Sequence, residues 1–93
     1  DLHADQIQGF FDIPVDHLKS EAIYLPYLQE NVDLSNVTFA SPDVGGVKRA
    51  RTFAKHFSRP LVICDKYRKR ANEIAEMTVI GDVTDADVIL VDD

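Results

Sequence analysis

The stretch Val-Thr-Phe-Ala-Ser-Pro-Asp-Val-Gly-Gly-Val-Lys-Arg, residues 37–49, decides the fold of this chain. Its first four residues are an apolar run with β-branched members, which predicts a buried strand. Pro42 ends that run, because proline cannot donate to a strand ladder and keeps the preceding residue extended. Gly45 and Gly46 allow a close backbone approach to a ligand, and apolar side chains then recur at helical spacing over residues 47–57. The stretch predicts a strand, a glycine-rich turn and a helix.

Asp43 lies in this turn, between the carboxyl end of the predicted strand and the amino end of the predicted helix. Ligands of parallel α/β sheets bind at the carboxyl ends of the strands, and helix amino ends favour phosphate. A carboxylate there is a suitable hard ligand for magnesium. Aspartate also caps turns by accepting backbone N–H groups, so the residue alone leaves a metal ligand and a turn cap as alternatives.

Composition and charge limit the class of protein. Ninety-three residues allow one domain at most, with a thin core, and a hydrophobic share of 45% argues against disorder. The net charge of −6 argues against a general nucleic-acid or membrane-surface binder. Eight of the ten Lys and Arg residues nevertheless fall in two clusters, Lys48 to Lys55 and Lys66 to Arg70. These clusters indicate either an anionic ligand or solvated helix faces.

The single cysteine and the lengths of the apolar runs bear on localisation. Cys64 excludes an internal disulfide and fits a reducing compartment. Within the apolar run 61–64 we interpret it as a small buried hydrophobe rather than a nucleophile. No apolar run approaches the roughly 20 residues of a spanning helix, and no signal-like segment is present. We expect a cytoplasmic protein.

The rest of the chain supplies further predicted elements. We expect a helical turn at 6–11, a connecting segment at 15–18, a helix at 21–29 interrupted by Pro26, and strands at 61–64, 73–80 and 87–91. Residues 65–71 are charged and predicted to be mobile. The first strand, its helix and the strand at 61–64 form a βαβ unit with a right-handed crossover. Because the strand at 87–91 stops on two carboxylates, we expect a fragment of a larger enzyme.

Five segments, in order along the chain, resemble motifs of ribose-phosphate pyrophosphokinase, also called phosphoribosyl pyrophosphate synthetase. They are Asp1–Ala4 with Gln6–Asp16, Ser41–Ala50, Asp65–Arg68, Ile80–Val83 and Val91–Asp93. The resemblance implies an α/β fold with a three-layer parallel sheet of the type I phosphoribosyltransferase kind, here incomplete. It divides the chain into a domain-junction segment, residues 1–20, and part of a C-terminal domain, residues 21–93.

The resemblance also implies a reaction, in which the pyrophosphoryl group of ATP moves to the 1-hydroxyl of ribose 5-phosphate and gives PRPP and AMP for nucleotide biosynthesis. This chemistry requires a metal at the triphosphate, cations at the transferring phosphorus and acceptors that orient the ribose. By resemblance the Mg²⁺-binding residues are His3 and Asp43, the catalytic residues are Lys66 and Arg68, and the ribose 5-phosphate-binding residues are Arg68, Asp92 and Asp93. Histidine is a less natural magnesium ligand, so His3 acts directly or through water.

Each assignment has a structural alternative. The first alternative is that His3 is an ordinary surface histidine. The second is that the Lys66–Arg68 segment is a solvated loop, and the third is that Asp92 and Asp93 carry no specific role at the end of the chain. In the family, the segment with Gln8, Asp12, Asp16 and His17 borders subunit contacts and a regulatory phosphate site. We assign this role only to the segment as a whole and to none of its residues singly, and we expect Phe10 and Phe11 to be packing residues.

The expected partners are ATP and ribose 5-phosphate, with neither nucleic acid nor membrane. A homo-oligomer is expected, a hexamer for the full-length parent, and an open sheet edge allows a dimer or strand exchange of this piece. The loop for the 5-phosphate and the amino-terminal domain lie outside the chain, so we expect it to be inactive alone. Two alternatives are a catalytically silent regulatory homologue, disfavoured by the intact Lys66 and Arg68, and a free-standing phosphate-binding α/β domain, disfavoured by five motifs in order.

Overall fold

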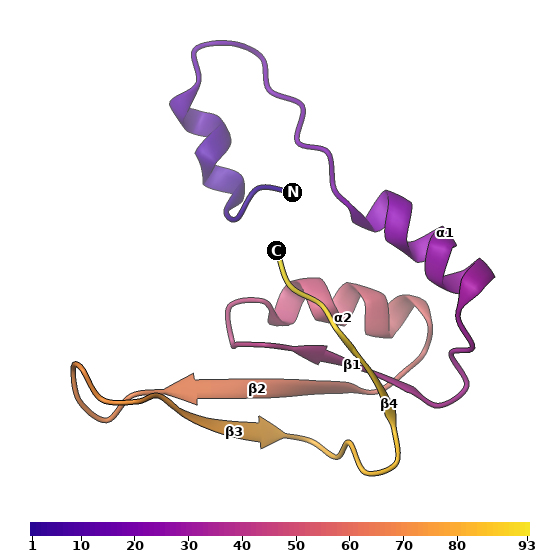
Figure 1. The fold of residues 1–93 in the computed structure, drawn as a ribbon. Coiled ribbons are helices and arrows are strands. Elements are labelled where there is room, and N and C mark those ends of the chain that lie inside the picture. Colours follow the sequence, from indigo (N-terminus) through magenta and orange to yellow (C-terminus); the bar gives the residue numbers. More distant parts are fainter.

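Seven helices and strands follow one another in the computed structural model, which describes all residues, 1–93. They are the 3-10 helix η1 (Asp5–Phe10), α1 (Glu21–Asn31), β1 (Val37–Ser41), α2 (Val47–His56), β2 (Leu61–Tyr67), β3 (Glu76–Ile80) and β4 (Asp87–Leu90), as drawn in Figure 1. The predicted strand, turn and helix at residues 37–57 are confirmed. The predicted interruption of α1 is wrong, since the helix runs through Pro26.

The four strands form one sheet in the order β3-β2-β1-β4. Strand β1 pairs in parallel with both β2 and β4, whereas β3 pairs antiparallel with β2. The predicted α/β fold class is confirmed, but β3 makes the sheet mixed instead of wholly parallel. The reason is the short connection at residues 68–75, which closes a hairpin and is too short for the crossover that a parallel pair needs.

Strand β2 is longer than the sequence indicated. It continues to Tyr67, through residues that we predicted to be mobile, because each of them finds a partner on β3. Asp65 pairs with Thr78, and Tyr67 pairs with Glu76. The expected strand at 73–80 is correspondingly shorter and begins at Glu76. Backbone pairing therefore extends the strand through these charged residues as far as the Tyr67–Glu76 pair, where the hairpin loop begins.

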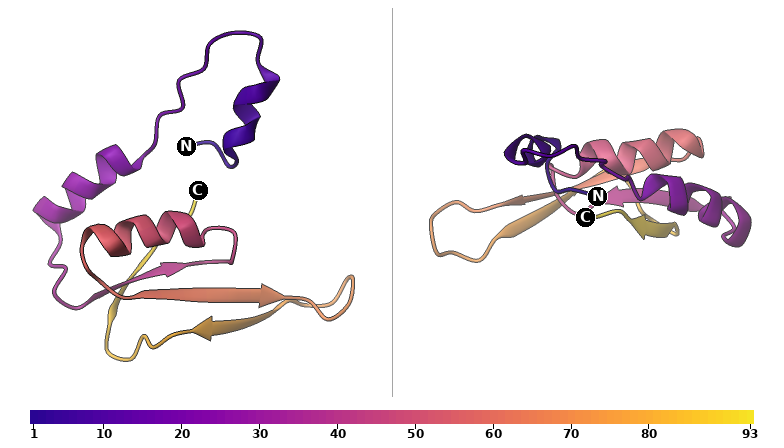
Figure 2. Two further views of the ribbon diagram at one scale, coloured as in Figure 1. Left: turned by 180° about the vertical axis from the view of Figure 1, so that it is seen from behind. Right: turned by 90° about the horizontal axis from the view of Figure 1, so that it is seen from above.

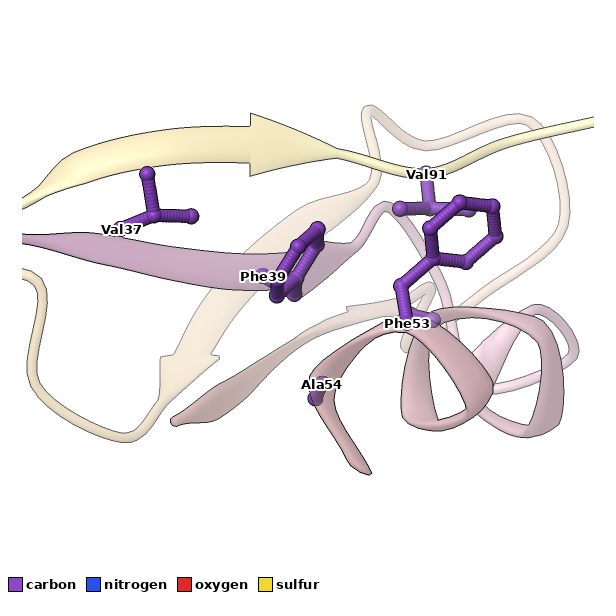
Figure 3. Packing of buried hydrophobic residues seen from close by; sticks show 6 residues of the cluster. Val37, Phe39, Phe53, Ala54 and Val91 are labelled. Carbon is purple, nitrogen blue, oxygen red and sulfur yellow. The ribbon is translucent and has the colours of Figure 1, made fainter. Parts of the chain in front are cut away.

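The core lies between β1 and α2 (Figure 3). Alternation along β1 directs Val37 and Phe39 to the same side. The Phe39 ring stacks on Phe57 at a centroid distance of 5.9 Å and packs at a tilt against Phe53 at 6.0 Å. Small Ala50 and Ala54 let α2 approach the strand closely, and both are buried. Only 10 of 93 residues are buried, which confirms the thin core expected from the length.

Both longer helices lie on one face of the sheet. Helix α2 packs on β1 and β2 and also contacts α1, whose Leu25 and Leu28 pack against the core cluster. The molecule is flat, with extents of 49 × 44 × 16 Å, as the view from above in Figure 2 shows. The opposite face of the sheet carries the half-exposed Val79 and Val88. Of the three predicted layers, residues 1–93 therefore form two, the helices and the sheet. No helix combines the length and the apolar character that crossing a membrane requires.

Candidate functional site at the carboxyl edge of the sheet

The carboxyl ends of β1 and β4 lie side by side, because the two strands are parallel neighbours. The turn after β1 and the residues Val91–Asp93 after β4 therefore meet at one edge, and the two chain ends approach each other there (Figure 1). A mostly polar cavity of about 610 Å³ opens at this place. Its lining includes His3, Asp43, Arg49, Asp92 and Asp93. Four of the predicted site residues thus share one cavity.

Asp43 caps its own turn. Its Oδ1 accepts a hydrogen bond from the Gly46 backbone N–H at 2.8 Å, and its carbonyl oxygen accepts one from the buried Ser41 hydroxyl at 2.6 Å. A Cβ atom on Gly46 would lie 2.9 Å from the Ser41 Oγ, which explains a glycine at this position. The turn-capping reading of Asp43 is confirmed. The second carboxylate oxygen stays available to a ligand, so the cap does not exclude metal binding.

Helix α2 adds positive potential to the cavity. Its amino end begins after Gly46, has no side-chain cap and has no acidic residue in its first turn. Lys48 and Arg49 of this turn line the cavity. Unpaired N–H groups and a helix dipole favour an anion at such an end. The cavity therefore combines acidic side chains with a cationic helix end.

His3 and Asp93 are in direct contact, although 90 positions separate them in sequence. His3 Nδ1 lies 2.5 Å from Asp93 Oδ2, and Arg49 Nη1 lies 3.7 Å from Asp93 Oδ1. The hydrogen bond from His3 is the largest cause that lowers the pKa of Asp93; desolvation by burial comes next and opposes it, and the nearby Arg49 charge lowers the pKa further. Asp93 is therefore ionised at neutral pH. Arg49 is therefore a site residue, which the sequence indicates only as part of a basic cluster.

The segment that carries His3 is fastened to the chain at two other points. The Leu2 N–H donates to Nε2 of His17 at 2.9 Å, and Nδ1 of His17 lies 3.3 Å from Asp5 Oδ1. Near the chain end, the Asp1 carboxylate accepts hydrogen bonds from the backbone N–H and the hydroxyl of Ser20. The sequence indicates His17 only as part of a region, because no local pattern encodes a contact between residues 15 positions apart.

Lys66 and Arg68 are not brought into the cavity. They lie at the end of β2 and the start of the hairpin loop, which projects beyond the same carboxyl edge (Figure 1). Between them, the Tyr67 hydroxyl donates to Glu76 Oε2 at 2.5 Å, and Lys69 Nζ lies 3.5 Å from Glu76 Oε1. The Glu76 carboxylate raises the pKa of Tyr67. The predicted convergence of all site residues is thus found for the acids and His3 only.

The cavity is not a preformed metal cage. No three His, Cys, Asp or Glu side chains are grouped so that they could enclose an ion. Magnesium, however, is commonly held by one or two carboxylates together with substrate phosphates and water. The free oxygen of Asp43 fits such an ion when it arrives with a polyphosphate.

Comparison with known proteins shows similarity along the whole chain, although no family model matches. A ribose-phosphate pyrophosphokinase of Porphyromonas gingivalis is 61% identical over 93 residues, which are 100% of this chain and 30% of that protein. The enzyme of Helicobacter hepaticus is 56% identical and ribose-phosphate pyrophosphokinase 3 of Saccharomyces cerevisiae 50% identical, again over the whole chain.

A solved structure, the phosphoribosylpyrophosphate synthetase of Mycobacterium smegmatis, is similar in fold. The TM-score is 0.84 at 38% sequence identity, and the match covers 100% of this chain and 29% of that one. The chain spans about 30% of the length of the curated relatives that it matches. The resemblance inferred from the five motifs is therefore confirmed in both sequence and fold.

Proposed function

We infer that this chain forms part of a ribose-phosphate diphosphokinase, because it corresponds along its whole length to a segment of the ribose-phosphate pyrophosphokinases. In the proposed reaction the 1-hydroxyl oxygen of ribose 5-phosphate bonds to the β-phosphorus of ATP. The bond from that phosphorus to the α,β-bridging oxygen breaks, AMP leaves and the hydroxyl proton is released. The products are PRPP and AMP, which would serve nucleotide biosynthesis.

One observation carries this proposal: His3, Asp43, Asp92 and Asp93 line one cavity at the carboxyl ends of two parallel strands. Open α/β sheets bind their ligands at this edge. The carboxylates supply acceptors for sugar hydroxyls, and the amino end of α2 favours phosphate. A sugar phosphate needs both kinds of group within one site.

We assign roles to these residues by chemistry. Asp43 and His3 are proposed to hold Mg²⁺, directly or through water, and Asp92 and Asp93 to accept hydrogen bonds from the ribose hydroxyls. Bound magnesium would neutralise part of the triphosphate charge. Arg49 adds a cation beside Asp93, and its guanidinium can donate two parallel hydrogen bonds to a phosphate group.

Lys66 and Arg68 are proposed to act after a movement of the hairpin. Lys66 lies near the end of β2 and Arg68 begins the connection at residues 68–75, and a closing loop can complete a catalytic site while it excludes water. Their charges would then stabilise the negative charge that grows on the non-bridging oxygens during transfer. Arg68 would also contact the 5-phosphate of the ribose.

The proposal extends to partners and surroundings. ATP and ribose 5-phosphate are the proposed substrates and Mg²⁺ the proposed metal, in a cytoplasmic homo-oligomer with a hexamer as the expected form. Support for an acidic, metal-assisted site comes from the polar cavity and its carboxylates. The net charge of −6 supports the absence of nucleic-acid binding.

The decisive experiment uses a chimera of the Porphyromonas gingivalis enzyme in which the matching segment is replaced by residues 1–93 of this chain, which is 61% identical to it. We expect the chimera to form AMP from ATP and ribose 5-phosphate at a rate within about tenfold of the unmodified enzyme. A folded chimera that forms no AMP, while the unmodified enzyme does, would contradict the proposed function. Such a result would favour the silent homologue.

A further inference from the structure

His17 makes two polar contacts through its two ring nitrogens and is nearly buried. Its side chain is 9% exposed, whereas that of His3 is 85% exposed. Nε2 accepts the Leu2 N–H and therefore has a free lone pair, which leaves the ring proton on Nδ1, facing the Asp5 carboxylate at 3.3 Å. The contacts thus select one neutral tautomer and one ring orientation. The Leu2 amide donor and the nearby Asp5 carboxylate together define this choice.

The His3 side chain, in contrast, makes few contacts that fix its position. Its exposed ring has one polar partner, Asp93, which is itself proposed to bind the sugar. Its place at the cavity therefore depends on the backbone on both sides. Leu2, which precedes it, is bonded to His17, and Asp5, which follows it at the start of η1, contacts the same ring. One imidazole clamps the segment on either side of His3.

We propose that His17 is a positioning residue, which fixes the backbone of residues 2–5 and thereby holds His3 at the cavity for metal binding. The inference rests on the proposed role of His3 as a metal ligand. His17 touches neither metal nor substrate in this scheme. Partners that orient a metal ligand typically change metal affinity by 10- to 100-fold when they are removed. Because His3 is one of several proposed ligands, we expect the low end of that range.

The test uses the chimera with four substitutions made separately: His17→Ala, His17→Gln, His3→Ala and, as a matched control, His56→Ala. Glutamine offers one acceptor and one donor and can replace both contacts of the ring. His56 is an exposed histidine of α2, whose ring packs on Phe57 outside the cavity. The first measurement is hydrogen exchange of the peptide with residues 1–5, and the second is binding of Mn²⁺ alone, followed by electron paramagnetic resonance.

We expect His17→Ala to speed exchange of the 1–5 peptide at least tenfold and to weaken Mn²⁺ binding about tenfold. His17→Gln should restore both to within about threefold of the parent, and His56→Ala should change neither. Unchanged exchange in a folded His17→Ala chimera would overturn the clamp. Faster exchange with unchanged Mn²⁺ affinity would overturn the positioning role, provided that His3→Ala does weaken binding.

The two proposals fail in different ways. If His3→Ala leaves Mn²⁺ affinity unchanged while His17→Ala still speeds exchange, the metal role of His3 is wrong and the clamp has only a structural role. If His17→Ala does not fold, Asp5→Ala provides the same test, since Asp5 is largely exposed and its loss frees the Nδ1 side of the ring. This variant should speed exchange and weaken Mn²⁺ binding by a smaller factor, and no effect on either would overturn the proposal.

Discussion

One added methyl group at Gly46 should displace the proposed metal ligand Asp43. The Cβ of Gly46→Ala would lie 2.9 Å from the Ser41 Oγ and 3.6 Å from the Asp43 Oδ1. Ser41 is fully buried and its hydroxyl bonds to the Asp43 carbonyl oxygen at 2.6 Å, so the hydroxyl cannot move aside without losing that bond. Overpacking of this kind costs about 1–3 kcal/mol. The strain falls on the turn that holds the carboxylate.

The magnitude follows from these contacts. A turn displaced by a few tenths of an ångström misplaces Asp43, and a misplacement of about 1 Å can cost 10²-fold in rate. We therefore expect Gly46→Ala to lower kcat/KM for PRPP formation by about 10- to 100-fold. Ser41→Ala removes one hydrogen bond worth about 0.5–1.5 kcal/mol and should lower kcat/KM by at most about tenfold.

A double-mutant cycle in the chimera tests the cause. In Ser41→Ala/Gly46→Ala the clashing oxygen is absent, so we expect kcat/KM close to that of Ser41→Ala alone, with a coupling of about 1–2 kcal/mol. Gly9→Ala is the control, because nothing lies within 4 Å of its added Cβ. A double mutant whose loss equals the product of the two single losses would refute the steric reasoning.

Three further predictions concern the strand ends, the hairpin and acid stability. Gly81→Ala should lower the free energy of unfolding by about 2–4 kcal/mol, since Gly81 has φ +117° and its Cβ would lie 2.6 Å from Val62 Cγ1; an unchanged urea midpoint would contradict this. Lys66→Ala should lower kcat by on the order of 10²–10³, and near-normal turnover would remove Lys66 from the mechanism. The Thr84 backbone N–H donates a hydrogen bond to the Asp82 carboxylate and lowers its pKa below 3.8. The ionised carboxylate therefore stabilises the fold above that pH, and this contribution disappears as the pH falls through the lowered pKa. Asp82→Asn should therefore reduce the loss of stability on acidification, as seen in urea midpoints between pH 5 and 2, and an identical acid profile would contradict the contact.

Local features of the sequence were enough to predict the βαβ unit and the turn at its centre. Pro42, Gly45 and Gly46 mark where the strand must end and where the backbone can turn tightly, and these effects act within a few residues. The apolar spacing of α2 likewise indicates its buried face before any partner is known. The motifs that resemble one enzyme family are equally local, and the comparisons bear them out along the whole chain.

Only the tertiary structure decided how distant residues meet. The contact of His3 with Asp93 and the clamp of His17 on Leu2 join residues 90 and 15 positions apart, and no periodic pattern encodes such pairs. The structure also decided that the strand ending at Tyr67 continues into an antiparallel hairpin and that Lys66 stays outside the cavity. The physical reason is that periodicity and turn chemistry act between neighbours along the chain, whereas a site forms only when sheet order brings the ends of separate strands together.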